Sequence, residues 1–138
     1  MKDSFPEKIK KAVKKEGFAR LLDIKPIEVS TGYAKVKMKV GEEHLNLLNI
    51  AHGGVVFTVL DEAFELASNS HGTIAMALSI TINYLRPVQA GETIIAEATE
   101  VARTRRTGNY RFLVTNQDGE LVAHGQGVVY RKDQELEI

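Results

Sequence analysis

The chain has 138 residues, no cysteine, and 18 basic residues against 18 acidic ones. This size predicts a single domain with its own core, and the charge balance gives no general reason to expect nucleic acid as a partner. The lack of cysteine excludes disulfides, thiolate nucleophiles and cysteine-based metal sites. No apolar run is long enough to span a membrane and no signal-peptide pattern follows the basic N-terminus, so we expect a soluble cytoplasmic protein.

The N-terminal segment predicts a short helix over about residues 4–16. Ser4 and Glu7 have the spacing of a capping box, and Pro6 suits a first helical turn. The lysines between positions 8 and 15 are typical of a solvated helix face.

Two strands and a loop are predicted next. Residues 24–30, interrupted by Pro26, have the pattern of an edge or bulged strand. Over residues 33–40 apolar and polar side chains alternate strictly, as in an antiparallel strand with one buried face. Residues 41–51 form the loop that leads into the following helix.

The longest helix is predicted over about residues 53–69. At about 100° per residue, five apolar residues fall on one face and polar residues fall on the opposite one. We expect the first face to be core and the second to be accessible. The apolar positions are Val56, Val59, Leu60, Ala63 and Ala67, and the polar positions are Thr58, Asp61, Glu62 and Glu65.

The remainder of the chain predicts about four strands joined by short turns. The apolar run at residues 74–85 predicts a strand that we expect at the centre of the sheet. Residues 109–115 and 121–131 flank Asp118-Gly119, which is a good hairpin signal. The tail from Asp133 is expected to fray. The fold class is therefore α+β, with one antiparallel sheet whose apolar face is covered by the long helix.

Gly53 and Gly54 make the start of that helix a candidate site for an anion or an oxyanion. The first N–H groups of a helix have no intrahelical partner and carry partial positive charge, and glycine leaves them open to approach. Asp61 lies roughly 10–12 Å further along the axis at 1.5 Å per residue. A carboxylate and an N–H that act on one carbonyl should each lie about 3 Å from it. If both belong to one site, Asp61 comes from another subunit.

Asp61 is either an exposed acid or a catalytic base. Phe57 and Phe64 flank it and Glu65 lies one turn on, and both desolvation and a like charge would raise its pKa toward that of a working base. Glu65 is the reserve candidate. His52 is either a helix-entry residue or a group that orients substrate.

The other polar candidates have weaker signals. Asn46 either caps its own turn or donates to a carbonyl or a water. Ser79 has no neighbouring base in the sequence, so a serine-hydrolase triad is unsupported, and the histidines lack metal-ligand spacing, so no metal is expected. Arg103, Arg105 and Arg106 form a solvated turn unless a ligand with several phosphates binds them.

Two segments, HLNLLNIAHGGVVFTVLDEAFELASNSHG and SITINYLRPVQAGETIIAEA, resemble the PaaI-like acyl-CoA thioesterases of phenylacetic acid degradation. The specific features are H-G-G, an aspartate eight residues after the first glycine, and N-Y-L-R-P-V-x-A-G-E. The resemblance covers about residues 18–131, and one departure is Asn49, where many relatives have glycine. It implies a hotdog fold, in which a curved antiparallel sheet surrounds one long helix. Dimers of this fold join sheets edge to edge and often pair into tetramers.

The resemblance also implies a site and a reaction. The family's oxyanion-hole glycine maps onto Gly53, beside Gly54, and its catalytic acid maps onto Asp61, contributed across the dimer interface. Asn46 and His52 match the family's loop asparagine and motif histidine. The implied reaction is hydrolysis of an aryl- or medium-chain acyl-CoA to free acid and coenzyme A, with no cofactor beyond the coenzyme A of the substrate.

The substrate would extend from this site in two directions. The acyl group would lie against Phe57 and Phe64, near Glu65 and Ser79, and the arginines at positions 103–106 would hold the phosphates of coenzyme A. One alternative function is a non-catalytic acyl-CoA sensor, which would not need a carboxylate beside a thioester. A hotdog dehydratase is a further alternative, but it would need a histidine base in a motif that this sequence lacks.

Overall fold

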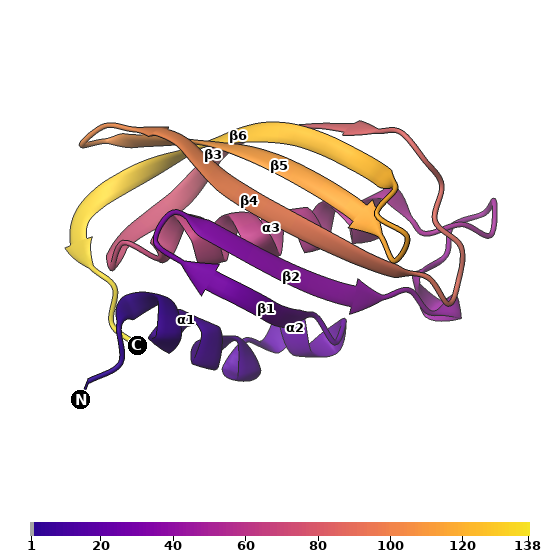
Figure 1. The fold of residues 1–138 in the computed structure, drawn as a ribbon, viewed down its shortest axis with the longest axis horizontal. Helices are drawn as coiled ribbons and strands as arrows, with labels where there is room; N and C mark the ends of the chain where they lie inside the picture. Colours follow the sequence, from indigo (N-terminus) through magenta and orange to yellow (C-terminus); the bar gives the residue numbers. More distant parts are fainter. Residues whose placement is uncertain (1) are drawn as a thin grey trace.

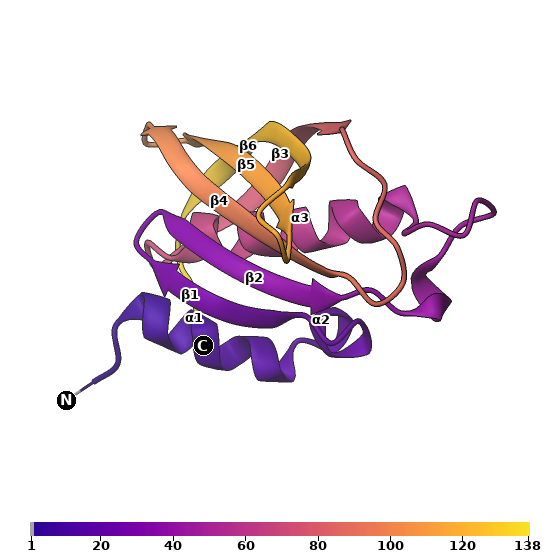
Figure 2. The same ribbon diagram turned by 45° about the vertical axis from the view of Figure 1, so that its right-hand side comes forward.

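The computed structural model describes residues 2–138 and consists of one long helix, α3 (Gly53–Asn69), and a curved six-stranded antiparallel sheet (Figure 1). The strand order is β1-β2-β4-β5-β6-β3. The short helices α1 (Phe5–Ala12) and α2 (Gly17–Leu21) lie beside β1, at the opposite edge from β3 (Figure 2). The strands are β1 Lys25–Ser30, β2 Tyr33–Lys39, β3 Thr73–Tyr84, β4 Thr93–Arg103, β5 Thr107–Asn116 and β6 Leu121–Glu135.

The N-terminal segment begins with the predicted capping box. Ser4 Oγ accepts a hydrogen bond from the Glu7 amide, and Glu7 Oε2 accepts one from the Ser4 amide. Helix α1 continues as a 3₁₀ turn, η1 (Val13–Lys15), before the backbone becomes extended at Glu16. Glu16 therefore lies at a corner between two helical pieces, where its side chain can point toward α3.

The local strand signals are confirmed. β1 is an edge strand whose register with β2 shifts between Pro26 and Glu28, because proline cannot donate to a strand ladder. β5 and β6 pair across the turn that holds Gly119, whose φ is +75°. The apolar face of β2 is fully buried against α3, as the alternation predicted, through Ala34, Val36 and Met38.

Three aromatic rings pack together in the core, and two of them leave no room for a side chain at Gly127. Phe64 of α3 is 1% exposed, and its ring centre lies 4.7 Å from that of Phe112 and 5.4 Å from that of Tyr110. A Cβ atom at Gly127 would come within 2.9 Å of both phenylalanine rings. Full burial of such a side chain stabilises a protein by about 1.5–3 kcal/mol, and each aromatic pair adds about 0.5–1.5 kcal/mol. This packing fixes the rotation of α3 and hence the direction of its polar residues.

Three sequence-based predictions need correction. β3 lies at the edge of the sheet rather than at its centre, although its apolar composition is typical of a strand covered on both sides. Glu62, which we expected on the accessible face of α3, is 5% exposed because the N-terminal segment covers that side of the helix. Residues 133–135, expected to fray, continue β6, and the Leu136 amide donates to the Gly72 carbonyl.

Within the described chain, no helix has both the length and the hydropathy of a membrane span.

Candidate active site

The loop before α3 is a compact turn organised by Asn46. Its side-chain Oδ1 accepts hydrogen bonds from the amides of Leu48 (2.9 Å) and Ile50 (3.4 Å), so Asn46 does cap its own turn. Asn49 has a φ of +59°. Asparagine tolerates this left-handed conformation better than most residues, so it suits this position of the loop. The backbone amide of Asn46 donates to the Ile50 carbonyl at 2.9 Å, whereas its side-chain Nδ2 donates to no residue of the described chain and remains available to a ligand.

His52 is the N-cap of α3. Its Nδ1 accepts a hydrogen bond of 2.9 Å from the Gly54 amide. Nδ1 must therefore carry a lone pair, which places the proton of the neutral ring on Nε2. A Cβ atom at position 54 would lie 3.1 Å from Nδ1, so glycine gives the ring the room for this contact.

The two glycine amides of the candidate oxyanion site are therefore not equivalent. Gly54 already donates to His52, whereas no residue between positions 2 and 138 accepts from the Gly53 amide. The Tyr84 hydroxyl donates to the Gly53 carbonyl at 3.0 Å, which fixes the orientation of the residue. The free donor at the helix start is the N–H of Gly53.

The segment after β3 holds this loop in place. The Ala51 amide donates to the carbonyl of Val88 at 2.8 Å, and Val88 is buried. The N-Y-L-R-P-V motif thus supplies both Tyr84 and Val88 to the loop that carries the H-G-G motif. Sequence reasoning did not identify these two supports, because nothing in their local pattern indicates contact with a loop more than thirty residues away.

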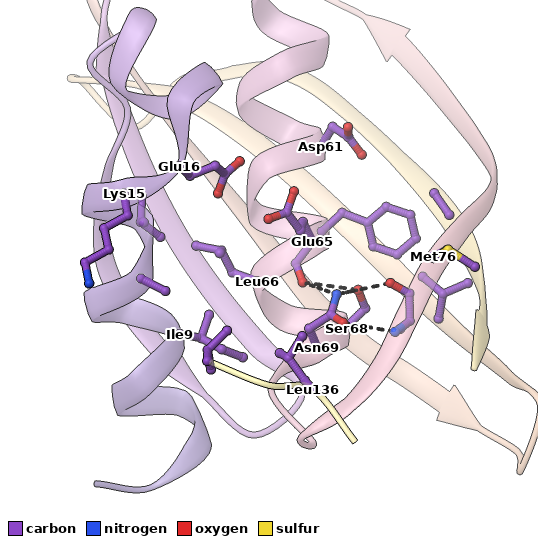
Figure 3. A pocket seen from close by; sticks show the side chains of 17 residues that line it. Ile9, Lys15, Glu16, Asp61, Glu65, Leu66, Ser68, Asn69, Met76 and Leu136 are labelled. Atoms are coloured by element: carbon purple, nitrogen blue, oxygen red, sulfur yellow. Dashed lines mark hydrogen bonds between the residues drawn. The ribbon is translucent and has the colours of Figure 1, made fainter. Parts of the chain in front are cut away.

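Asp61 lies two turns further along α3, on the wall of a pocket of about 600 Å³ between α3, the N-terminal segment and β3 (Figure 3). Phe64 and Glu65 line the same pocket, and Met76 projects from β3 on the opposite side. Burial, and the negative charge of nearby Glu16, raise the pKa of Asp61. Its carboxylate has no hydrogen bond or ion pair with any described residue, so it is available to a ligand or a water molecule.

Glu16 is the residue of this pocket that sequence reasoning missed. It comes from the corner between η1 and α2 and points at Glu65 of α3 (Figure 3). Burial and the Glu16 carboxyl group raise the pKa of Glu62, and the same two causes raise the pKa of Glu65. No sequence signal links Glu16 to α3, because only the fold of the N-terminal segment brings them together.

The other predicted site residues lie elsewhere. Phe57 is half-buried and is not part of the Asp61 pocket. Ser79 is exposed in a separate depression of the sheet, with Thr81 and Asn109.

The three arginines all have acidic partners. Arg105 and Arg106 form ion pairs with Asp133 at 2.8 and 3.4 Å. Arg103 lies 3.8 Å from Glu100 and also contacts His71. These contacts account for the cluster without a bound phosphate.

Within one chain, Asp61 and the loop residues that precede Gly53 line different hollows. Asp61 lines the pocket beneath the N-terminal segment, whereas Asn46 and His52 line a second hollow with the exposed side chains of Leu47 and Leu48. Asp61 lies eight positions after Gly53, which corresponds to a rise of about 12 Å along α3. One small carbonyl group therefore cannot contact both within a single chain.

Comparison with known proteins places this architecture in a family. The family model "Thioesterase superfamily" matches residues 48–123. Acyl-coenzyme A thioesterase PaaI of Escherichia coli K12 is 38% identical over 113 residues, which cover 82% of this chain and 81% of the relative.

Solved structures agree with the sequence comparison. The E. coli PaaI protein from the phenylacetic acid degradation operon has a TM-score of 0.89 at 33% identity, covering 97% of this chain and 100% of the other. A hypothetical thioesterase of Streptococcus pneumoniae TIGR4, solved with coenzyme A, has a TM-score of 0.83 at 26% identity, covering 91% and 100%.

A long helix held in a curved antiparallel sheet is the hotdog fold, which this chain shares with the E. coli PaaI structure. The chain belongs to the thioesterase superfamily and is PaaI-like within it. The family resemblance and the fold predicted from the sequence are thereby confirmed.

Proposed function

We propose that the protein hydrolyses an acyl-CoA thioester at a site shared by two subunits, with Asp61 of one and the Gly53 amide of the other. The proposal rests on the absence of hydrogen-bond partners for these two groups in the single chain. Asp61 is a half-buried carboxylate without a partner among the described residues, and Gly53 holds the free amide at the start of α3. The relatives named acyl-CoA thioesterase, and the relative solved with coenzyme A, support the substrate class.

The Gly53 N–H acts on the thioester carbonyl. It donates to the carbonyl oxygen and stabilises the negative charge that develops there during attack, aided by the partial positive charge of the helix start. Asn46 positions the thioester or the attacking water through its side-chain Nδ2.

Asp61 moves the proton. It accepts a proton from the water whose oxygen forms the new bond to the carbonyl carbon. When the carbon–sulfur bond breaks, Asp61 returns that proton to the leaving sulfur, which gives a free acid and coenzyme A. Direct attack by Asp61, through an anhydride that water then hydrolyses, uses the same two groups.

Pairing through β3 would create the shared site. This strand is twelve residues long and its outer edge has no neighbouring strand in the described chain, although the Asn69 side chain bonds the backbone at Ala75. An open apolar edge of this length invites a second strand. Met76, Leu78 and Tyr84 of this strand are exposed in the single chain. Two copies joined at this edge form one continuous sheet, and a pair of such dimers gives the tetramer implied by the family.

We place the acyl group in the pocket of about 600 Å³ beside Asp61, which is within the range of small-ligand sites. Its wall is formed mainly by apolar side chains, including Phe64 and Val129, and suits an aryl-acetyl or medium-chain acyl group. The arginines near position 105 are not included in the site, because acidic partners already balance their charge.

The direct test is release of free thiol from a panel of aryl- and alkyl-CoA thioesters. We expect turnover on at least one member and a rank order that reports the acyl preference. Tight binding of the same thioesters without any thiol release would contradict hydrolysis and support the acyl-CoA sensor instead.

A further inference from the structure

Three carboxyl groups from two distant segments converge below Asp61. Glu16, Glu62 and Glu65 each place one oxygen within 4.8 Å of the other two. Glu62 and Glu65 are three residues apart on α3 and so lie on neighbouring positions of the helix surface. Glu16 reaches them from the corner between η1 and α2, and Figure 3 shows it pointing toward Glu65.

This cluster has no cationic partner in the chain from residue 2 to residue 138. The ion pairs of the structure involve other residues. Lys15 lines the same pocket, but its side chain points away from Glu16 and Glu65 (Figure 3).

The lack of a cationic partner matters most for Glu62, because this residue is buried. It is 5% exposed, and its Oε1 atom has no hydrogen-bond partner although it is buried. Buried carboxylates are ordinarily paired or coordinate a metal, because an isolated buried charge is costly. One carboxylate oxygen of Glu62 lies within 4.8 Å of an oxygen of Glu16 and of Glu65, so a cation bound between the three acids would give this side chain the partner that it lacks.

We propose that Glu16, Glu62 and Glu65 bind one hard divalent cation of the Mg²⁺, Ca²⁺ and Mn²⁺ class. These ions prefer carboxylate oxygens, and the cluster contains no nitrogen or sulfur ligand. Bonds of about 2.0–2.6 Å to a shared ion place opposite oxygens about 4–5 Å apart, which agrees with the observed spacing. Water from the adjoining pocket completes the coordination.

The cation would clamp the N-terminal segment onto α3. Glu16 is the only ligand outside that helix, so binding couples the corner after η1 to the wall of the Asp61 pocket. This inference goes beyond thioester hydrolysis and does not depend on it. A proton is the competing occupant, since burial and neighbouring acids raise the pKa of Glu62 and of Glu65 when no cation is bound.

The test adds Mn²⁺ to the metal-free 138-residue chain at pH 8 and detects its binding by electron paramagnetic resonance. We expect one bound Mn²⁺ per chain and a rise in Tm of several degrees on addition of Mn²⁺ or Ca²⁺. Glu62→Gln should bind at least tenfold more weakly and lose the Tm rise, because a neutral amide replaces the central ligand. Glu42→Gln, which removes an exposed acid far from the cluster, should behave as wild type.

Glu62→Gln has the shape of the protonated side chain and should fold. If it does not, Glu65→Gln, at an exposed position, makes the same test. The absence of stoichiometric Mn²⁺ binding, or equal binding by wild type and both variants, would overturn the cation site. The three acids would then share protons rather than a metal.

Discussion

Replacing Asp61 by asparagine should lower kcat for thioester hydrolysis by about 10²–10⁴-fold, the range expected for loss of a general base. The amide keeps the size of the side chain but cannot take the proton from water. Because the acyl pocket is unchanged, KM should change much less than kcat. Thiol release under saturating substrate measures the first quantity, and the dependence on substrate concentration measures the second.

The structure also predicts that this variant folds. The Asp61 carboxylate makes no hydrogen bond or ion pair with the described residues, and its burial disfavours the charge. The Tm of Asp61→Asn should therefore equal or exceed that of wild type. Asp118→Asn, the same change in an exposed turn, is the matched control and should keep full activity. If Asp61→Asn is folded and turns over at the wild-type rate, Asp61 is not the catalytic acid.

Replacing Gly53 by proline should reduce kcat by about 10²–10³-fold, the effect of removing one oxyanion-hole donor. Proline lacks the N–H that we assign to the developing oxyanion. The position tolerates proline, since Gly53 is the first residue of α3 and the preceding His52 has φ −58° and ψ 138°, which suit a residue before proline. Steady-state thiol release compares the variant with wild type.

Gly53→Ala is the control for this change, because alanine adds a side chain but keeps the N–H. A Cβ atom there would meet the Tyr84 ring at 3.5 Å, an ordinary contact. The alanine variant should retain far more activity than the proline variant. Equal losses in both would point to a steric cause, and full activity of Gly53→Pro would exclude the amide from the mechanism.

The sequence predicts the parts of the fold that depend on local patterns. The alternation over residues 33–40, the turn at Gly119 and the apolar stripe of the long helix all correspond to buried faces or turns in the structure. Each signal reports which way neighbouring side chains point, and that depends on few other residues.

The same reasoning fails where another part of the chain supplies the environment. A helical wheel places Glu62 with the polar residues, but the N-terminal segment covers that side and brings Glu16 against it. The apolar run of β3 is typical of a strand with two neighbours, whereas one chain provides only β6. A second copy at this edge would account for that composition.

In the candidate site, too, the features that depend on local sequence can be predicted and those that depend on distant contacts cannot. Gly53 and Asp61 are visible in the sequence as a motif, and helix rise alone separates them. The sequence does not show that the Gly54 amide is bonded while the Gly53 amide is free, because this difference depends on the His52 ring accepting from Gly54. Tyr84 likewise reaches Gly53 only through the folded path of β3.

The proposed site uses Asp61 from one subunit and Gly53 from its partner. Asp61→Asn and Gly53→Pro chains with different affinity tags should be produced together, and capture through both tags should verify mixed oligomers. In a dimer captured through both tags, one of the two sites has both groups intact and the other has neither. We therefore predict about half of wild-type thiol release from the captured dimers, although each variant alone is nearly inactive. Verified mixed oligomers that are no more active than either variant alone would contradict the shared site.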